Sequence, residues 1–248
     1  MLAIIGGSGL TQLSNLEITR RQVVRTPYGE PSGAITFGNI QGRQVIFLAR
    51  HGYGLTIPPH EVNYCANIWA LHSQQAGDVV SVASVGGIRE DLTPGTLVIP
   101  DQILDYTHDR RATFFSANDH GVTYIDFTYP YCETLRQRLF RAAELAGEAV
   151  VAGGTYAATQ GPRLETAAEI NRLERDGADM VGMTGMPEAA LAKEMGLCYA
   201  AIAVIVNHAA GRGSSERGIK LEDIGAVSEK AMARVGSVLE KLATLDGD

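Results

Sequence analysis

Two polar residues end an apolar run near the carboxyl end of this sequence. The run AIAVIV at 201–206 is followed at once by Asn207 and His208, and then by Ala209 and Ala210. Such a run indicates a buried strand. A carboxamide at its end can cap a helix, serve a structural hydrogen bond, or bind a ligand. The pattern alone leaves these alternatives open, and it does not fix the role of His208.

Three other apolar runs end in residues suited to binding an anion. IIGGSGL places Ser8 in a glycine-rich turn, where backbone N–H groups and a hydroxyl can face a phosphate. FLARHG ends in Arg50 and His51, and a guanidinium matches two phosphate oxygens. SVASVGG offers Ala83 and Ser84 among small residues that allow close approach of a ligand. Each feature has a structural alternative: a βα turn, a surface salt bridge, or a glycine-rich turn.

A fourth stretch contributes Glu165, Met183 and Thr184, in GPRLETAAEI and GADMVGMTGMPEA. Glu165 could equally have a structural role, because a carboxylate in the first turn of a helix is stabilising. Met183 is compatible with the core, and Thr184 with the cap of the helix that starts near Pro187. Ligands collect at strand ends in open α/β sheets, and apart from Glu165, which opens a predicted helix, these residues fall at predicted strand ends.

The elements that must position these residues alternate along the chain. The 248 residues are 45% apolar and 20% charged, as in ordinary globular proteins. No linker or repeat divides them, so we predict a single domain over residues 1–248. Alternating strands and helices predict an α/β fold with parallel pairing. We expect strands at 2–5, 45–49, 79–85, 97–99, 150–158, 180–183 and 198–206, helices at 61–75, 131–145, 165–175, 187–195 and 221–245, and an antiparallel hairpin at 34–49.

Several classes of protein are disfavoured by composition. No apolar stretch reaches the roughly 18 residues of a membrane span, and the start of the chain lacks the features of a signal peptide. A net charge of −7 argues against nucleic-acid binding, and the basic runs RQRLFR and HDRR are short. Cys65, Cys132 and Cys198 lack metal-ligand spacing, so we expect neither a disulfide framework nor a zinc site, and a cytoplasmic location.

Catalytic signatures are also missing, since the sequence has no GxSxG elbow and no HExxH or carboxylate cluster for a metal. However, five stretches in one order resemble the methylthioadenosine phosphorylase and trimeric purine nucleoside phosphorylase family. They are AIIGGSGL, ARHG with VNYCANIWAL, GGIREDLTPGTLVIPDQILDYT, GPRLETAAEI, and GADMVGMTGMPEAALAKEMGLCYAAIAVIVNHAAG. The resemblance extends from the first residues to about Gly211. It implies an α/β fold with a mixed, barrel-like central sheet, a homotrimer, and reversible phosphorolysis of a purine nucleoside. It also implies phosphate as co-substrate, with no metal or organic cofactor. From charge and hydropathy we expect no nucleic-acid or membrane partner.

The resemblance assigns roles by position. Met183 matches the residue under the ribose, while Asn207 and Ala209 match the stretch that contacts the purine. Asn207 is the expected catalytic residue, because it would stabilise the departing base. The positions that match the phosphate site are Ser8, Arg50, His51, Ala83, Ser84 and Thr184.

Two departures from the methylthioadenosine phosphorylase pattern concern the base. Glu165 stands where those enzymes have Ser, and Asn207 stands where they have Asp, as in inosine- and guanosine-type phosphorylases. Ala209 replaces a second Asp. An ionised Glu165 can only accept a hydrogen bond, so it suits N1–H of a 6-oxopurine and faces a lone pair in adenine. The sequence therefore predicts a 6-oxopurine base.

The sugar end points to a methylthio group. Where inosine-type enzymes place a His for the 5′-hydroxyl, this chain has Leu221, or Ile219 if a gap is allowed, and Leu55 replaces a further polar residue. The alternative is a polar group from a neighbouring subunit, near Tyr124 or His120. Together the two ends predict S-methyl-5′-thioinosine as substrate. Runners-up are an inosine/guanosine phosphorylase, a methylthioadenosine phosphorylase and, from another class, a non-catalytic nucleoside-binding protein.

Overall fold

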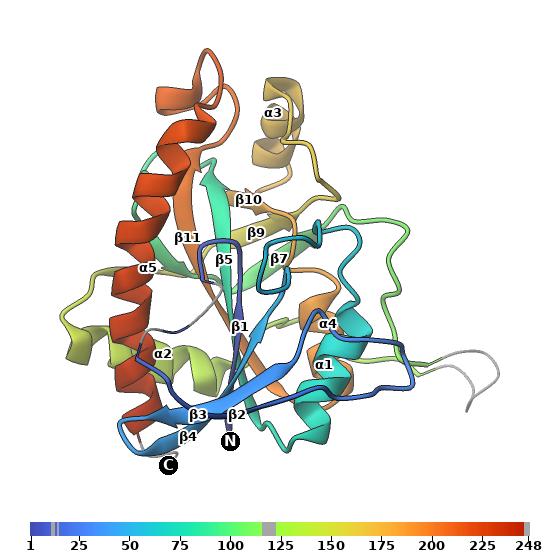
Figure 1. Ribbon diagram of the computed structural model, residues 1–248. Helices are drawn as coiled ribbons and strands as arrows, with labels where there is room; N and C mark the ends of the chain where they lie inside the picture. The colour runs from blue at the N-terminus through green and yellow to red at the C-terminus, as the bar shows by residue number, and fades with distance from the viewer. Residues whose placement is uncertain (11–12, 14, 116–122, 246–248) are drawn as a thin grey trace.

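A mixed sheet forms the centre of the protein in the computed structural model, which describes residues 1–10, 13, 15–115 and 123–245 (Figure 1). The strands are β1 Leu2–Gly6, β2 Glu17–Gln22, β3 Ile35–Ile40, β4 Arg43–Ala49, β5 Asp78–Gly87, β6 Leu97–Ile99, β7 Gln102–Asp105, β8 Val150–Ala152, β9 Thr155–Ala158, β10 Met180–Gly182 and β11 Cys198–His208. The helices are α1 Tyr64–Ser73, α2 Glu133–Ala146, α3 Ala167–Arg175, α4 Glu188–Glu194 and α5 Leu221–Thr244, with a 3₁₀ turn at Gly213–Ser215.

The pairing of the sheet branches at β5. One continuous path runs β2-β3-β4-β1-β5-β10-β9-β7, while β11 pairs with β5 and also with β6, which in turn pairs with β8. β5 is parallel to β1 and β11 and antiparallel to β10. The predicted α/β class with a mixed central sheet is confirmed.

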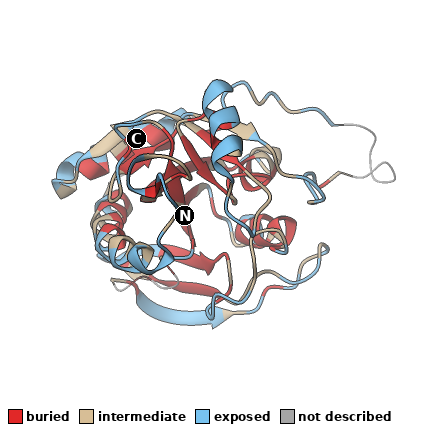
Figure 2. Ribbon diagram, turned by 90° about the horizontal axis from the view of Figure 1, so that it is seen from above, coloured by how far each residue is buried: buried red, intermediate tan, exposed pale blue. Residues whose placement is uncertain are grey.

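Helices cover both faces of this sheet. Alternate residues of β11 enter opposite cores: Ile202 and Val204 pack with residues of α2 and α5, while Ala203 and Ile205 pack with residues of α1 and α4. Figure 2 shows the buried sheet enclosed by helices whose outer faces are exposed. Smaller apolar contacts seat α3 over Val181.

The structure differs from the predicted elements mainly at glycines and at exposed edges. The strand expected at 150–158 is two strands, because Gly153 and Gly154 take positive φ angles of 79° and 135°. β8 then pairs with β6, and β9 pairs with β10 and β7. β2, whose sequence is EITRRQ, lies on an exposed edge and so lacks the apolar signal of a buried strand.

The expectation of no disulfide was wrong. Cys132 and Cys198 are joined in a disulfide across a sequence separation of 66 residues. The start of α2 meets the start of β11 there, and the Cys132 N–H donates to the Tyr199 carbonyl at 2.8 Å. The two cysteines are brought together by the tertiary fold, so their spacing in the sequence does not indicate that they are paired. Cys65 is free, and burial raises the pKa of its thiol to about 11.

Candidate active site

One cavity of about 450 Å³ lies at the carboxyl ends of the central strands, and it gathers most of the predicted site residues. β1 ends at Gly6 just before Ser8, β4 ends at Ala49 just before Arg50, and β10 ends at Gly182 just before Met183. The carboxyl ends of the parallel strands β1 and β4 meet at one edge of the sheet, whereas β10 is antiparallel to β5 and brings Met183 to the cavity from the opposite direction. The predicted residues in the wall are Ser8, Arg50, His51, Leu55, Ala83, Ser84, Glu165, Met183, Thr184, Asn207, Ala209 and Ile219.

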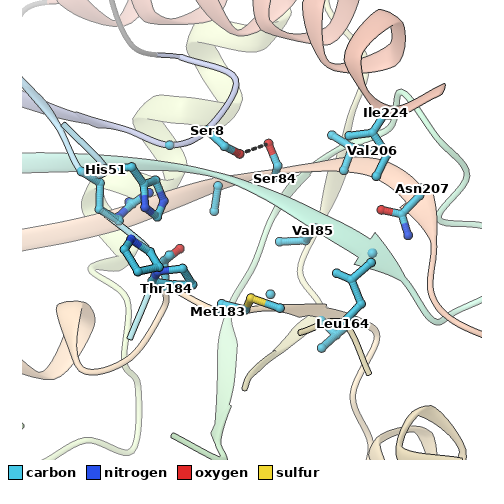
Figure 3. Close-up of a pocket in the computed structure, with 18 of the residues that line it drawn as sticks. Ser8, His51, Ser84, Val85, Leu164, Met183, Thr184, Val206, Asn207 and Ile224 are labelled. Atoms are coloured by element: carbon cyan, nitrogen blue, oxygen red, sulfur yellow. Dashed lines mark hydrogen bonds between the residues drawn. The ribbon is translucent and has the colours of Figure 1, made fainter. Parts of the chain in front are cut away.

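The polar groups divide between two ends of the cavity (Figure 3). Ser8, Ser84, His51 and Thr184 lie toward one end, and Asn207 lies at the other. Met183 and Val85 lie between them in the same view, with Val206, Ile224 and Leu164 near Asn207. The arrangement gives a hydroxyl-rich end, an apolar middle, and an end with an amide.

The hydroxyl-rich end is built from turns that follow strands. Ser8 Oγ donates to Ser84 Oγ across 3.3 Å, and the Thr184 N–H donates to the Tyr156 hydroxyl at 3.3 Å. α4 begins at Glu188 without a side-chain cap. The Thr184 hydroxyl is therefore not the N-cap that the sequence left open as an alternative.

Arg50 is fully buried and forms an ion pair that the sequence analysis missed. Its Nε donates to Glu188 Oε2 at 2.7 Å and its Nη2 to Glu188 Oε1 at 2.9 Å, and both side chains are 0% exposed. Nη2 also donates to Ser81 Oγ and Nη1 to the Val82 carbonyl. Burial alone would lower the pKa of Arg50, but the attraction and hydrogen bonding of Glu188 outweigh it and raise the pKa. In the sequence Glu188 looks only like a first-turn acid of a short helix, so nothing marked it out.

Glu188 is itself held by further donors. The Ser81 and Tyr199 hydroxyls donate to Oε1 at 2.7 and 2.8 Å. Tyr199 stacks on Tyr131, with ring centroids 6.1 Å apart. Arg50 is therefore fixed before any ligand arrives, and one N–H on its Nη1 remains beyond the bond to the Val82 carbonyl.

His51 has its tautomer set by a backbone partner. Nδ1 lies 2.9 Å from the Ile57 carbonyl oxygen, which can only accept, so Nδ1 carries the hydrogen. Burial and then the positive charge of Arg50 lower the pKa of His51, and Ile57 and Glu188 offset part of that effect. At neutral pH the ring is neutral, with a lone pair on Nε2.

Glu165 and Asn207 present the acceptors and donors expected for a ligand. α3 begins at Ala167 with Thr166 as its N-cap, so Glu165 lies before the helix, and its Oε1 accepts the Thr159 hydroxyl at 2.6 Å. Asn207 Nδ2 donates to the His208 carbonyl at 2.7 Å. This bond orients the amide and leaves its oxygen and one N–H for a ligand.

Two residues outside the predicted set shape the middle of the cavity. Gly161 has a φ of 60°, and a Cβ there would come within 2.4 Å of Met183 Sδ. Arg110, from the basic run HDRR, turns inward and donates to the carbonyls of Met183, Met186 and Gln160 at 2.7 to 2.8 Å. Its guanidinium therefore fixes the two loops that line this part of the site.

At the start of the last helix, the structure corrects the sequence analysis. Ile219 and Ile224 line the cavity, whereas Leu221 is 66% exposed and lies outside it. Leu221 is the first residue of α5 and its side chain lies in solvent, whereas Ile224, one turn further along the helix, reaches the cavity wall. Tyr124 is 89% exposed, and His120 lies outside the described residues.

His208 serves the fold and does not line the cavity. Its Nδ1 accepts hydrogen bonds from the Ser214 hydroxyl and N–H, at 2.9 and 3.3 Å. A Cβ on Gly213 would lie 2.7 Å from the ring, so this turn packs closely against it. His208 therefore anchors the turn that leads toward Ile219.

Within the described ranges, no helix combines the length and apolarity needed to cross a membrane. The same residues contain no group of three or more His, Cys, Asp or Glu side chains placed to hold a metal ion.

Comparison with known proteins identifies the class. Residues 1–244 match the phosphorylase superfamily, and the chain belongs to that family. A probable S-methyl-5′-thioinosine phosphorylase of Pseudomonas syringae pv. tomato is 50% identical over 240 residues, which cover 97% of each chain. A 6-oxopurine nucleoside phosphorylase of Pyrococcus furiosus is 45% identical over 215 residues, covering 85% of this chain and 80% of the relative.

A solved structure gives the same assignment. Methylthioadenosine phosphorylase from Schistosoma mansoni, in complex with adenine, superimposes with a TM-score of 0.93 at 31% identity, covering 98% of this chain and 90% of that one. These relatives are nucleoside phosphorylases, and the chain is a pentosyltransferase of the same type.

Proposed function

We propose that this enzyme uses inorganic phosphate to cleave S-methyl-5′-thioinosine reversibly, giving hypoxanthine and 5-methylthioribose 1-phosphate. The observation that carries the proposal is the composition of the cavity at the strand ends. Hydroxyl groups lie at one end, a carboxylate and an amide would face the base, and apolar side chains in and just before the first turn of α5 would face the sugar. The 50% identity to a probable S-methyl-5′-thioinosine phosphorylase supports the same substrate.

Phosphate would bind at the hydroxyl-rich end. The hydroxyls of Ser8, Ser84 and Thr184 are donors, and the second N–H of Arg50 Nη1 adds a charged one. Ala83 lines the wall beside Ser84 and would offer backbone only. Because Arg50 is already held by Glu188, the site would need little rearrangement when phosphate arrives.

The purine would bind between Glu165 and Asn207, with Ala209 forming the apolar wall behind it. The free oxygen of Glu165 accepts from N1–H of hypoxanthine but opposes the N1 lone pair of adenine. The remaining Asn207 N–H donates to O6, and its oxygen accepts from a proton on N7 of the departing base. Leaving a buried acceptor unpaired is costly, which favours oxopurines over adenine.

The sugar would lie over Met183, with its 5′ substituent against Ile219, Ile224 and Leu55. An apolar wall suits a methylthio group and leaves a hydroxyl without a partner. Ile224 takes the place that the sequence analysis gave to Leu221, so the preference rests on a different residue of the same helix.

Catalysis would come from positioning and from stabilising the leaving group. The bond from C1′ to N9 breaks with its electron pair going to the purine, and a phosphate oxygen forms the new bond to C1′. The ribose ring carries oxocarbenium-like charge meanwhile. Asn207 acts as the catalytic residue by hydrogen bonding to the base as negative charge develops, and a proton is taken up at N7. No protein nucleophile or metal is required, and phosphate is the only co-substrate.

Further features belong to the same proposal. We expect a homotrimer, since the exposed Leu55 and Leu164 at the mouth of the cavity would be covered by a neighbouring subunit. We also expect a cytoplasmic enzyme whose partners are its nucleoside and phosphate, with no nucleic acid and no membrane. Gel filtration with light scattering tests the trimer, and a monomer in solution would contradict it.

The experiment that tests the function compares kcat/KM for S-methyl-5′-thioinosine, inosine and S-methyl-5′-thioadenosine in a phosphate-dependent assay. We expect the methylthioinosine value to be the highest. A preference for inosine would mean that the apolar wall does not face the 5′ group, and a preference for methylthioadenosine would mean that Glu165 does not face the base. Absence of cleavage of all three would support a nucleoside-binding protein instead.

A further inference from the structure

The carboxylate of Glu165 lies at the boundary between two cavities. It lines the cavity at the strand ends and also a second cavity of about 370 Å³ beside α3. Its hydrogen-bond partner Thr159 lines the second cavity and is not among the described residues that line the first. The bond from the Thr159 hydroxyl to Oε1, at 2.6 Å, therefore draws Oε1 toward the second cavity and leaves Oε2 to face a ligand in the first.

Thr159 is held firmly in this position by its backbone. Its N–H donates to the Gly182 carbonyl at 2.8 Å, and its own carbonyl and that of Gln160 accept from Arg110 Nη2 at 3.4 and 2.8 Å. The hydroxyl also lies 3.3 Å from the Gly182 oxygen, but it has one hydrogen, and the shorter distance and negative charge of Glu165 direct that hydrogen to the carboxylate. We therefore expect the bond to Oε1 to persist when a base binds.

The 6-oxopurines differ in how many donors they present beside O6. Hypoxanthine has N1–H next to an apolar C2–H. Guanine has N1–H next to a 2-amino group, and these two parallel N–H groups match the two oxygens of one carboxylate. A carboxylate that offers only one oxygen pairs with N1–H alone. With Oε1 held by Thr159, Glu165 is complementary to hypoxanthine.

A 2-amino group would find no substitute partner near Glu165. In the proposed pose Asn207 contacts O6 and N7, and the 2-amino group lies on the other side of N1, beyond its reach. The labelled neighbours of Asn207 at this end of the cavity are Val206, Ile224 and Leu164, which are all apolar (Figure 3). The amino group of guanine would therefore lose its water without gaining a hydrogen bond, which is costly.

We propose that Thr159 limits Glu165 to a single hydrogen bond with the base, so that the enzyme selects hypoxanthine nucleosides over guanine nucleosides. The inference rests on the proposed function for the place of the base. It narrows the substrate class from 6-oxopurines in general to those without a 2-amino group. Thr159 is a positioning residue, since it acts through Glu165 and does not touch the base.

Calorimetry with inosine and guanosine in phosphate-free buffer tests this without any cleavage, and the ribose that both share cancels the sugar preference. Inosine should bind about 10- to 100-fold more tightly than guanosine, because the 2-amino group is left unpaired. In the phosphate-dependent assay, kcat/KM for S-methyl-5′-thioinosine should exceed that for S-methyl-5′-thioguanosine by a similar factor. Equal affinity of the wild-type protein for inosine and guanosine would overturn the proposal.

Variants of Thr159 test whether its hydroxyl is responsible. Thr159→Val keeps the shape and frees Oε1, and it should reduce the inosine-over-guanosine ratio at least about fivefold. Thr159→Ala also removes the hydroxyl and gives the same test if Thr159→Val does not fold. Thr159→Ser keeps the hydroxyl and should retain the ratio within about twofold. A wild-type ratio in both variants without the hydroxyl, or a lost ratio in Thr159→Ser, would contradict the assignment.

A matched control is available at Thr107. Its hydroxyl donates to Asp105 Oδ1 at the same distance of 2.6 Å, and neither residue lines either cavity. Thr107→Val should leave the inosine-over-guanosine ratio within about twofold of the wild-type value. A change as large as that of Thr159→Val would mean that the effect does not depend on Glu165, and would overturn the proposal.

The outcomes separate this inference from the proposed function. A preference for methylthio nucleosides with equal use of hypoxanthine and guanine overturns the role of Thr159 alone. Selectivity for inosine over guanosine, with ribose preferred to the methylthio sugar, supports the role of Thr159 and overturns the proposed substrate. Selective binding of inosine with no cleavage of any nucleoside supports the role of Thr159 and overturns the proposed reaction.

Discussion

Replacing Glu188 with glutamine removes the charge that balances Arg50 and keeps the shape of the side chain. The carboxylate accepts from Nε and Nη2 of Arg50 and from the hydroxyls of Ser81 and Tyr199, all between 2.7 and 2.9 Å. A glutamine retains one oxygen and turns an N–H toward one of these donors. Breaking a buried ion pair by removing one partner costs about 3–5 kcal/mol, and both side chains here are 0% exposed. We expect the free energy of unfolding of Glu188→Gln to fall by about that amount.

Urea unfolding at a fixed protein concentration, followed by the fluorescence of Trp69, measures this change. Glu144→Gln is the matched control, because Glu144 pairs with Arg141 on the surface with its side chain 71% exposed. We expect a change below about 1 kcal/mol there. The double variant Arg50→Met with Glu188→Leu should recover part of the loss, since no charge is then left buried. A loss below about 1 kcal/mol in Glu188→Gln would refute the reasoning.

Four further changes test separate parts of the site. Glu165→Gln should lower the ratio of kcat/KM for methylthioinosine over methylthioadenosine at least about tenfold, and an unchanged ratio would remove the account of base choice. Ile224→His should raise kcat/KM for inosine relative to methylthioinosine by about 2- to 10-fold, while Leu221→His, on the exposed side, should leave the ratio within about twofold. Arg110→Lys should lower kcat/KM about 10- to 100-fold by loosening the loops of the cavity, and wild-type kinetics would show that these loops hold without it. Cys198→Ser should lower the free energy of unfolding by up to about 4 kcal/mol, as expected for a 66-residue loop, and equal urea midpoints with and without the bond would contradict this.

The sequence predicted the central elements well because they carry strong local signals. The run that ends at Asn207 is a buried strand, and the hairpin at 34–49 forms β3 and β4 around Gln41 and Gly42, which both take positive φ. The apolar pattern that predicts strands was weakest in strands that are not buried, such as the exposed β2. The break at Gly153 followed from pairing with two different partners, which apolarity alone does not encode.

The sequence predicted most of the residues that line the cavity, but it did not predict the residues that hold them in place. Residues that face a ligand follow strands, and a recognisable order of motifs marked them. Glu188 and Arg110 act through other residues, so their types and positions look like those of ordinary surface charges. Leu221 was misplaced because alignment of a loop cannot tell which side of the following helix faces the cavity. The disulfide was missed for a similar reason, because contact between α2 and β11 is a property of the tertiary fold.

The branching of the sheet at β5 has a consequence for how the chain is made. The two long strands that carry Ser84 and Asn207 pair with each other, yet Asp78 of β5 and its partner Cys198 are 120 residues apart (198 − 78). At roughly 5–20 residues per second, a ribosome needs about 6 to 24 s to synthesise that stretch. During that time one apolar edge of β5, with the sequence DVVSVASVGG, has no strand to pair with. Such an edge is prone to pair with other chains. A chain that stops before β11 would therefore keep an aggregation-prone edge. The nascent protein is protected from pairing with other chains at this edge only once β11 has been synthesised and has paired with β5.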